Sequence, residues 1–282
     1  MASRSIRYKS LSIRTPRFVG VGVGDDNDAA AFLQEAGIAD YMQQRAIFEL
    51  VSRLKGAGLW SKMKAIYPFI GGTASTHKWN LKDPQDTDAA GRITFNGGWT
   101  HNANGITGNG TNTIANTNRT PLNYVADGSS HLSIYHRSDI NAPNASPDIG
   151  AYNTGNSQAH LINTGNNTNV YDIVAYQAPQ NQIAATNTTP KSGFWVLTRT
   201  DTTTMKGFRN NAQLGSTNTN TSAGFTSIQN TNYVIGSATN SGGGYTSRNY
   251  AFATIGDGIT DTEASALYDI VDLYQKRLDR AV

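Results

Sequence analysis

Residues 71–258 consist largely of Asn, Thr, Ser and Gly, and their apolar residues come in short runs between clusters of those four types. Short apolar runs bounded by turn-forming residues are typical of β-strands. The three glutamates of the chain, Glu35, Glu49 and Glu263, all lie outside this stretch. We therefore expect a β-rich body, with helices confined to the two ends of the chain.

The strand candidates follow one another closely. Asn210 and Asn211 stand between two of them and offer the two positive-φ residues of a tight hairpin turn. Many short strands, at spacings of roughly ten residues, are typical of sandwiches and jelly rolls. The sequence predicts a mainly β fold, a sandwich or a jelly roll. The expected strands are 65–70, 131–136, 171–176, 194–200, 205–209, 233–236 and 250–255.

Helix signals flank this body. Asp40 precedes a run with apolar residues at helical spacing, and Gln43 follows it at the position that completes a capping box. Thr260 and Glu263 repeat that pattern before the last amphipathic segment. We expect an extended arm over 1–24, a short helical segment over 25–64, the sandwich over 65–258, and a C-terminal helix over 259–282 that packs on the body.

The positive charge is concentrated at the N-terminus. The net charge is +3, and residues 1–24 contain no acid. We interpret this arm as an attachment segment for other proteins of an assembly and expect no nucleic-acid contact. The chain has no cysteine, which excludes disulfides, and no apolar run long enough to insert into a membrane. The cations of the arm are Arg4, Arg7, Lys9, Arg14 and Arg17.

Four segments together resemble bacteriophage virion proteins that carry a laminin-G-like or concanavalin-A-like jelly roll: 59–69, 80–84, 95–105 and 250–258. The likeness extends over roughly residues 28–280, in the same order and spacing. It implies a two-sheet antiparallel sandwich and a place on a tail fibre, capsid fibre or similar appendage of a virion. Our interpretation adds a spike or decoration as further places, and a homotrimer as one arrangement. The arm lies outside the likeness, so its point of attachment is not implied.

Catalytic residues are not expected. The glucanase branch of this fold uses two neighbouring carboxylates, whereas the β region has no Glu and its aspartates are scattered in turn-like settings. Asp172 alone stands within an expected strand, without an acidic neighbour. We therefore expect solvated turn acids and a non-enzymatic protein. His131 and His136 are five residues apart on one strand and face opposite sides, which is wrong for a shared metal.

Metal binding has one weak candidate. Residues 83–88 hold Asp83, Asp86 and Asp88, and oxygen ligands of this kind suit calcium. The segment lacks the Gly and the terminal Glu of an EF-hand loop, so we expect a proline-containing turn and assign no metal ligand and no cofactor.

Carbohydrate contact suits this composition, because flat aromatic faces and neutral amides or hydroxyls satisfy sugars without strong charge. The candidate ligand-binding residues are Trp99, His101, Asn102 and Tyr245, whereas Trp60 and Trp195 are expected in the core. The leading hypothesis is a virion component that presents a jelly roll to host-surface glycan. Two alternatives stay open: a purely structural virion protein, and a soluble lectin or glucanase-like protein.

Overall fold

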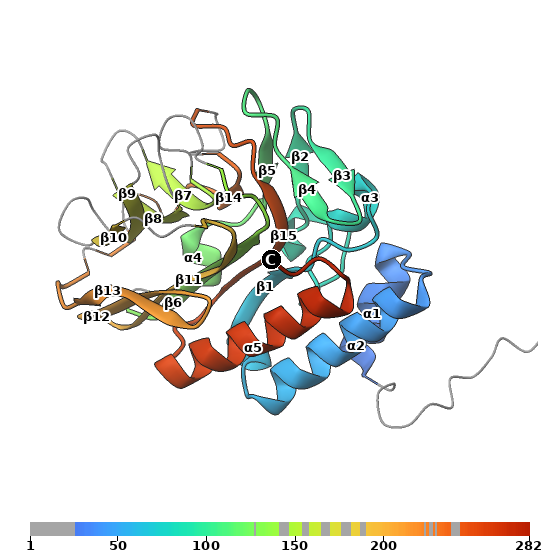
Figure 1. Ribbon diagram of the computed structural model, residues 1–282, viewed down its shortest axis with the longest axis horizontal. Helices are drawn as coiled ribbons and strands as arrows, with labels where there is room; N and C mark the ends of the chain where they lie inside the picture. Colours follow the sequence, from blue (N-terminus) through green and yellow to red (C-terminus); the bar gives the residue numbers. More distant parts are fainter. Residues whose placement is uncertain are drawn as a thin grey trace, which may run out of the picture.

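The computed structural model places three layers on one another: a helix layer, a central sheet and an outer sheet (Figure 1). It describes residues 26–282 except 127, 141–146, 154–157, 165–169, 176–181, 187–189, 223, 226–227, 229 and 238–242. The arm over 1–24 therefore lies outside the described residues. The predicted mainly β fold, with two antiparallel sheets, N-terminal helices and a C-terminal helix, is confirmed.

Every strand pair within the two sheets is antiparallel, and β1 pairs with β15 at the side of the central sheet. The central sheet has the order β13 (Ala212–Asn218), β12 (Thr204–Arg209), β11 (Gly193–Asp201), β6 (Ser130–His136), β15 (Asn249–Gly256), β4 (Gly105–Thr107) and β3 (Thr100–Asn102), with β1 (Met63–Tyr67) joined to β15. The outer sheet has the order β10 (Gln182–Thr186), β9 (Val170–Ala175), β8 (Gln158–Asn163), β7 (Ile149–Asn153), β14 (Val234–Ile235), β5 (Ile114–Asn116) and β2 (Thr94–Asn96).

The hairpin between β12 and β13 turns where the sequence predicts. Asn210 and Asn211 have φ values of 44° and 69°, and Arg209 pairs with Ala212 across them. Two successive residues with positive φ match the right-handed twist of the flanking strands. The register of this edge therefore follows directly from two adjacent asparagines.

The helices begin and end at residues that cap them. The side chain of Asp26 accepts hydrogen bonds from backbone amides in the first turn of α1 (Asn27–Ala36). The side chain of Asp40 accepts a hydrogen bond from the amide of Gln43 in α2 (Tyr41–Gly56). Thr260 and Glu263 form a reciprocal capping box on α5 (Asp261–Arg277). The short helices are α3 (Ala74–His77), α4 (Pro121–Tyr124) and the 3₁₀ turns Trp60–Lys62 and Asp88–Ala90.

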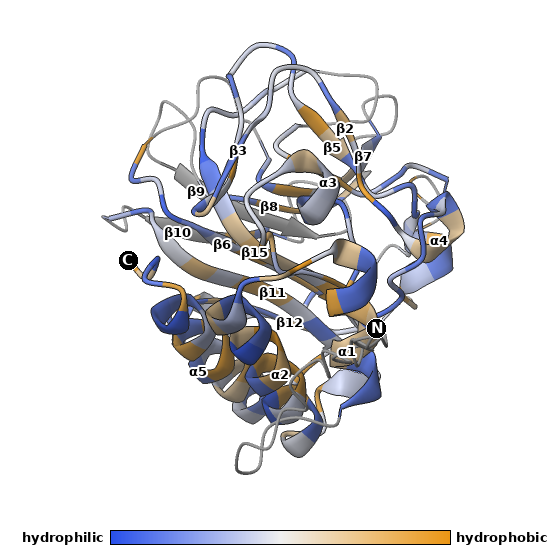
Figure 2. Ribbon diagram, turned by 90° about the vertical axis from the view of Figure 1, so that its right-hand side faces the viewer, coloured by the Kyte–Doolittle hydropathy of each residue, from blue (hydrophilic) through white to orange (hydrophobic). Residues whose placement is uncertain are grey.

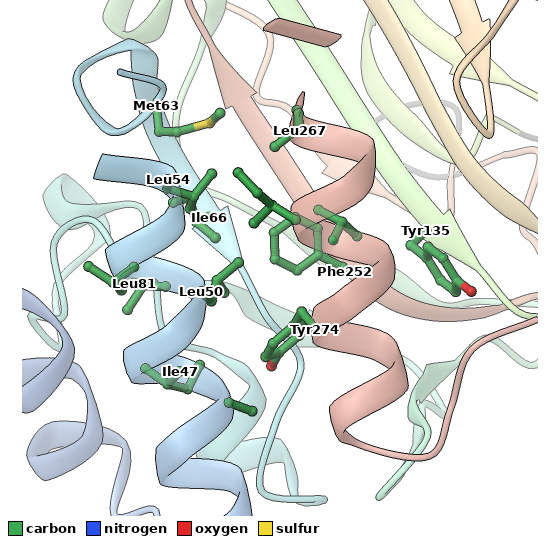
Figure 3. Packing of buried hydrophobic residues seen from close by; sticks show 14 of the residues in the cluster. Ile47, Leu50, Leu54, Met63, Ile66, Leu81, Tyr135, Phe252, Leu267 and Tyr274 are labelled. Carbon is green, nitrogen blue, oxygen red and sulfur yellow. The ribbon is translucent and has the colours of Figure 1, made fainter. Parts of the chain in front are cut away.

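Helices α2 and α5 lie side by side on the face of the central sheet that the outer sheet leaves open (Figure 1). Each carries both hydrophobic and hydrophilic residues (Figure 2). Their apolar sides meet Phe252 and Ile66 of the sheet in a continuous buried cluster, with Leu50 and Leu267 among its members (Figure 3). A second cluster, which includes Ile134, fills the space between the two sheets.

Arg280, just after α5, links the helix layer to the central sheet through buried hydrogen bonds. Its side chain is only 1% exposed, and it donates to the carbonyl oxygens of Pro68, Phe69 and Ala251 at 2.8–2.9 Å and to Gln275 Oε1 at 2.6 Å. Within the described part of the chain no carboxylate forms an ion pair with this guanidinium. Its charge is therefore balanced by oriented carbonyl dipoles.

Arg280→Met should lower the free energy of unfolding by about 3 kcal/mol, because it leaves buried carbonyl oxygens without a donor. Arg53→Met is the matched control, since Arg53 sits in an exposed ion pair with Glu49 and should change stability by less than about 0.5 kcal/mol. Urea denaturation of the two variants measures both values. Equal stabilities of the two variants would contradict the role given to Arg280.

Candidate functional site

The last strands of the two sheets, β2 and β3, end at the same rim of the sandwich. The chain crosses from one sheet to the other through Gly97, Gly98 and Trp99. Gly97 has a φ of 82°, and a Cβ on it would lie 2.1 Å from the carbonyl oxygen of Asn112. The crossing is therefore held tight by a glycine that no other residue replaces without strain.

Three aromatic rings gather at this crossing, and we call them the aromatic rim: Phe95, Trp99 and His101. The ring centroid of Phe95 lies 6.0 Å from that of Trp99 and 4.7 Å from that of His101, both in edge-to-face arrangements. Phe95 and Trp99 are partly buried against the core between the sheets. The structure thus brings together two of the predicted ligand residues and adds Phe95.

A hydrogen-bond chain fixes which nitrogen of His101 carries the proton. The amide of Gly72 donates to His77 Nε2 at 3.1 Å, so the proton of neutral His77 is on Nδ1. His77 Nδ1 lies 3.0 Å from His101 Nδ1, which must accept, and this leaves the proton of His101 on Nε2. Burial lowers the pKa of His101, so the ring is neutral at physiological pH.

The Nε2–H of His101 is available to a ligand. It makes no hydrogen bond within the described residues and is not among the buried polar atoms that lack a partner, so solvent reaches it. Trp99 differs, because its Nε1 atom is buried without a partner in the described part of the chain. A Cβ on Gly236 would come within 2.6 Å of the Trp99 ring. Trp99 is therefore partly exposed as a residue, and its N–H is turned inward.

The other two predicted ligand residues are placed differently. Asn102 follows His101 on β3, so its side chain points to the opposite face of the strand, where its Oδ1 accepts from the amide of Asn104 at 2.8 Å. Tyr245 precedes Thr246, whose methyl group lies beside Gly236 and therefore near the Trp99 ring. Segment 238–242, which precedes Tyr245, lies outside the described residues.

The five cations of the N-terminal arm, Arg4, Arg7, Lys9, Arg14 and Arg17, lie outside the described residues, so their role stays a prediction. None of the helices from residue 26 onward is both long and apolar enough, in its described part, to cross a membrane.

One aspartate is placed contrary to expectation. Asp148, expected as a solvated turn acid, is completely buried and forms an ion pair with the equally buried Arg248 at 2.7 Å. Tyr250 donates to the same carboxylate oxygen at 2.9 Å, and the amide of Thr164 donates to the other at 2.8 Å. Burial alone would raise the pKa of Asp148, but Arg248 and then His136 bring it below its ordinary value. Asp148 and its three partners therefore link the two sheets through buried polar contacts.

The carboxylates of segment 83–88 face cations rather than one another. Asp86 pairs with Lys78 at 2.7 Å and with Arg92 at 3.0 Å, and Arg92 also pairs with Asp88. Across the residues that the structure describes, no group of three or more His, Cys, Asp or Glu side chains could hold a metal ion. The weak calcium candidate therefore gains no support from these side chains.

His77 and Phe95 were not recognised from the sequence. The His77–His101 contact joins residues 24 positions apart, and nothing in the local pattern around His77 points to it. Phe95 does stand between Thr94 and Asn96 in an alternating run, which is a signal for a strand residue that faces the interior. The sequence thus indicates that the Phe95 side chain faces inward, but it does not indicate which rings Phe95 contacts.

No family model matches the sequence. No curated protein matches it either. Among solved structures, a sialidase of Trypanosoma rangeli in complex with 2,3-difluoro-KDN is similar at 12% identity with a TM-score of 0.53, over 82% of this chain and 40% of that one. The same sialidase in complex with 2,3-difluorosialic acid, as a covalent intermediate, gives 13% identity and a TM-score of 0.51, over 82% and 39%.

This chain spans about two fifths of the length of those sialidase chains. At such low identity the likeness shows the fold alone: a β-sandwich of a kind also present in a glycosidase. The expectation of a non-enzymatic protein is wrong in the light of this comparison, since the neighbours are enzymes. The expectation considered only paired carboxylates, which serve only some of the mechanisms that glycosidases use.

Stability should fall as the pH drops below about 6.5, because four buried histidines resist protonation only in the folded state. Burial lowers the pKa of His77 and His160 to about 3 and of His131 and His136 to about 4. Between these values and the ordinary value of 6.5, the unfolded chain binds more protons, so the free energy of unfolding rises with pH and levels off above 6.5.

Each such histidine contributes up to about 1.4 kcal/mol per pH unit in this window. Urea denaturation at several pH values measures the slope, and His77→Gln should make it shallower by one proton's worth. Stability that is unchanged between about pH 7 and pH 5 would show that these rings are not held neutral.

Proposed function

We propose that this chain is a component of a bacteriophage particle that contacts a host-surface glycan through the aromatic rim. The observation that carries the glycan part is the neutral, partly exposed cluster of Phe95, Trp99 and His101 at the meeting point of both sheet edges. The sandwich fold, which a sialidase shares, supports the same class of ligand.

The chemistry of the rim fits a sugar. Partly exposed aromatic rings offer apolar contact to the C–H groups of a pyranose, and the Nε2–H of neutral His101 donates to a hydroxyl oxygen. A protonated imidazole would favour acidic groups instead. The proton chain from Gly72 through His77 keeps one donor pointing outward and leaves no charge at the site.

The place on a virion rests on the four sequence segments that resemble phage virion proteins, and the arm over 1–24 supplies the attachment. A purely structural virion protein and a soluble lectin or glucanase-like protein are the outcomes that would replace this proposal. The likeness to part of a sialidase chain makes cleavage part of the question. Release of reducing sugar from a bound polysaccharide by the full chain separates a binding module from a glycosidase.

His101→Phe should weaken binding of the full chain to bacterial surface polysaccharides by about fivefold, because it removes one hydrogen-bond donor and keeps the ring. His101→Gln should retain most of the affinity, since a side-chain amide both accepts from His77 and donates outward. Surface plasmon resonance on immobilised polysaccharide measures all three proteins.

Tyr41→Ala is the matched control, because it removes an aromatic ring that is 48% exposed at the start of α2, in the helix layer and not in the aromatic rim. Thermal unfolding of each variant shows that it is folded. The rim is excluded as the contact if His101→Phe and Tyr41→Ala bind as tightly as the unaltered chain.

Deleting residues 2–24 should abolish incorporation into phage particles and leave a folded protein, because the described body holds both apolar clusters without them. Immunogold electron microscopy of particles, with an antibody to the body, measures incorporation. A truncated chain that still labels particles would show that the arm is not the attachment. Absence of label with the full chain would overturn the virion placement.

A further inference from the structure

A second candidate site lies on the face of the central sheet that the helices cover, where β11 and β12 meet the beginning of α5. It is a groove of about 300 Å³, well away from the aromatic rim. We call it the threonine groove. Its lining residues are Thr198, Thr200, Thr204, Lys206 and the four residues Ile259, Thr260, Asp261 and Thr262.

The groove arises where the helix layer ends. Along β11, Phe194 and Val196 face the helices and belong to the buried cluster beneath them, and alternate residues on that face continue as Thr198 and Thr200. On β12 the same face changes from Phe208 to Lys206. Since α5 begins only at Asp261, the hydroxyl-bearing end of the hairpin is left partly uncovered.

Two threonines hold the walls in place. Thr198 Oγ1 accepts from the amide of Ile259 and donates to its carbonyl oxygen, both at 2.9 Å. Thr260 Oγ1 accepts from the amide of Glu263 and donates to its carboxylate. The groove is therefore built on a strand pair and a capped helix start that are bonded to each other, so it needs little rearrangement to receive a ligand.

Several polar groups that line the threonine groove can still form hydrogen bonds with a ligand. Lys206 Nζ pairs with Asp261 Oδ2 at 2.6 Å, which leaves further N–H groups on the ammonium and a second carboxylate oxygen. The hydroxyls of Thr200 and Thr262 have no hydrogen-bond partner among the described residues. The groove thus brings together donors, acceptors and threonine side chains from the two strands and the start of α5, with the fully buried Ile259 beneath them.

We infer that the threonine groove binds one neutral sugar residue through its vicinal hydroxyls, as a second contact for the glycan-binding function proposed above, on which this inference rests. Asp261 accepts from one hydroxyl, Lys206 donates to its neighbour, and the threonine methyl groups contact the C–H face of the ring. One cation and one carboxylate cancel across the groove, so an acidic sugar gains no net attraction there and its carboxylate is repelled by the carboxylate of Asp261.

The test is nitrogen-15 NMR titration of the full chain with four methyl glycosides: those of glucose, galactose, mannose and N-acetylglucosamine. At least one should shift the amide signals of Thr200, Thr204 and Thr262, with millimolar affinity. Tetrahydropyran, which has the ring but no hydroxyls, should not shift them, and N-acetylneuraminic acid should bind more weakly.

The double variant Thr200→Val/Thr262→Val should weaken this binding about tenfold, since it removes two hydroxyls and conserves their shape. Thr202→Val is the matched control, because Thr202 lies at the exposed turn of the same hairpin and does not line the groove. If the control and the double variant bind alike, or if none of the four glycosides shifts the groove signals, the inference is overturned.

His101→Phe separates this inference from the proposed function. The inference predicts that this rim variant leaves the groove titration unchanged. Shifts confined to residues of the aromatic rim would leave the proposed function standing and remove the threonine groove. Shifts confined to the groove would remove the rim and keep this inference.

Discussion

Strands β6, β11 and β15 bury both of their faces, one against the outer sheet and the other against helices α2 and α5. All seven residues of β6 are buried, although four of them are Ser or His. Those polar residues have internal partners: Ser133 and His131 both reach Thr254 of β15, at 2.6 and 3.0 Å. Because neither face meets water, polar residues in such a sheet depend on partners within the protein. Among the described residues of β6, the Nε2 atom of His136 is an exception, since it is buried without a partner.

Charges are placed where the layers join. Arg280 ties α5 to the turn after β1, and the Asp148–Arg248 pair ties the two sheets together. Phe69 lies at the first of these joints with a φ of 41°, a strained value for an aromatic residue, and Arg280 holds its carbonyl oxygen. Buried charged side chains thus hold both junctions together, the one between the helix layer and the central sheet and the one between the two sheets.

Local patterns in the sequence predicted much of the fold. The two asparagines of the β12–β13 turn and the Thr260–Glu263 capping box need only neighbours along the chain. The opposite facing of His131 and His136 follows from strand alternation, and the structure confirms it: His136 packs beside Trp195 between the sheets, whereas His131 bonds to the segment that leads into α5.

The candidate sites were harder to predict, because they are formed by residues that lie far apart in the sequence. The His77–His101 contact spans 24 positions, and the Asp148–Arg248 pair spans 100. Asp148 was expected in solvent for this reason: its partner is invisible in the local sequence. The exclusion of enzymes went wrong for another reason, because counting carboxylate pairs tests only one mechanism of glycosidases.

The central claim is that the aromatic rim meets a glycan. The most direct measurement is amide hydrogen exchange of the full chain, with and without polysaccharide from bacterial cell surfaces. The account predicts slower exchange over residues 94–107 when polysaccharide is present, with exchange in α2 unchanged. Exchange over 94–107 that is the same in both conditions, while polysaccharide binds, would contradict it.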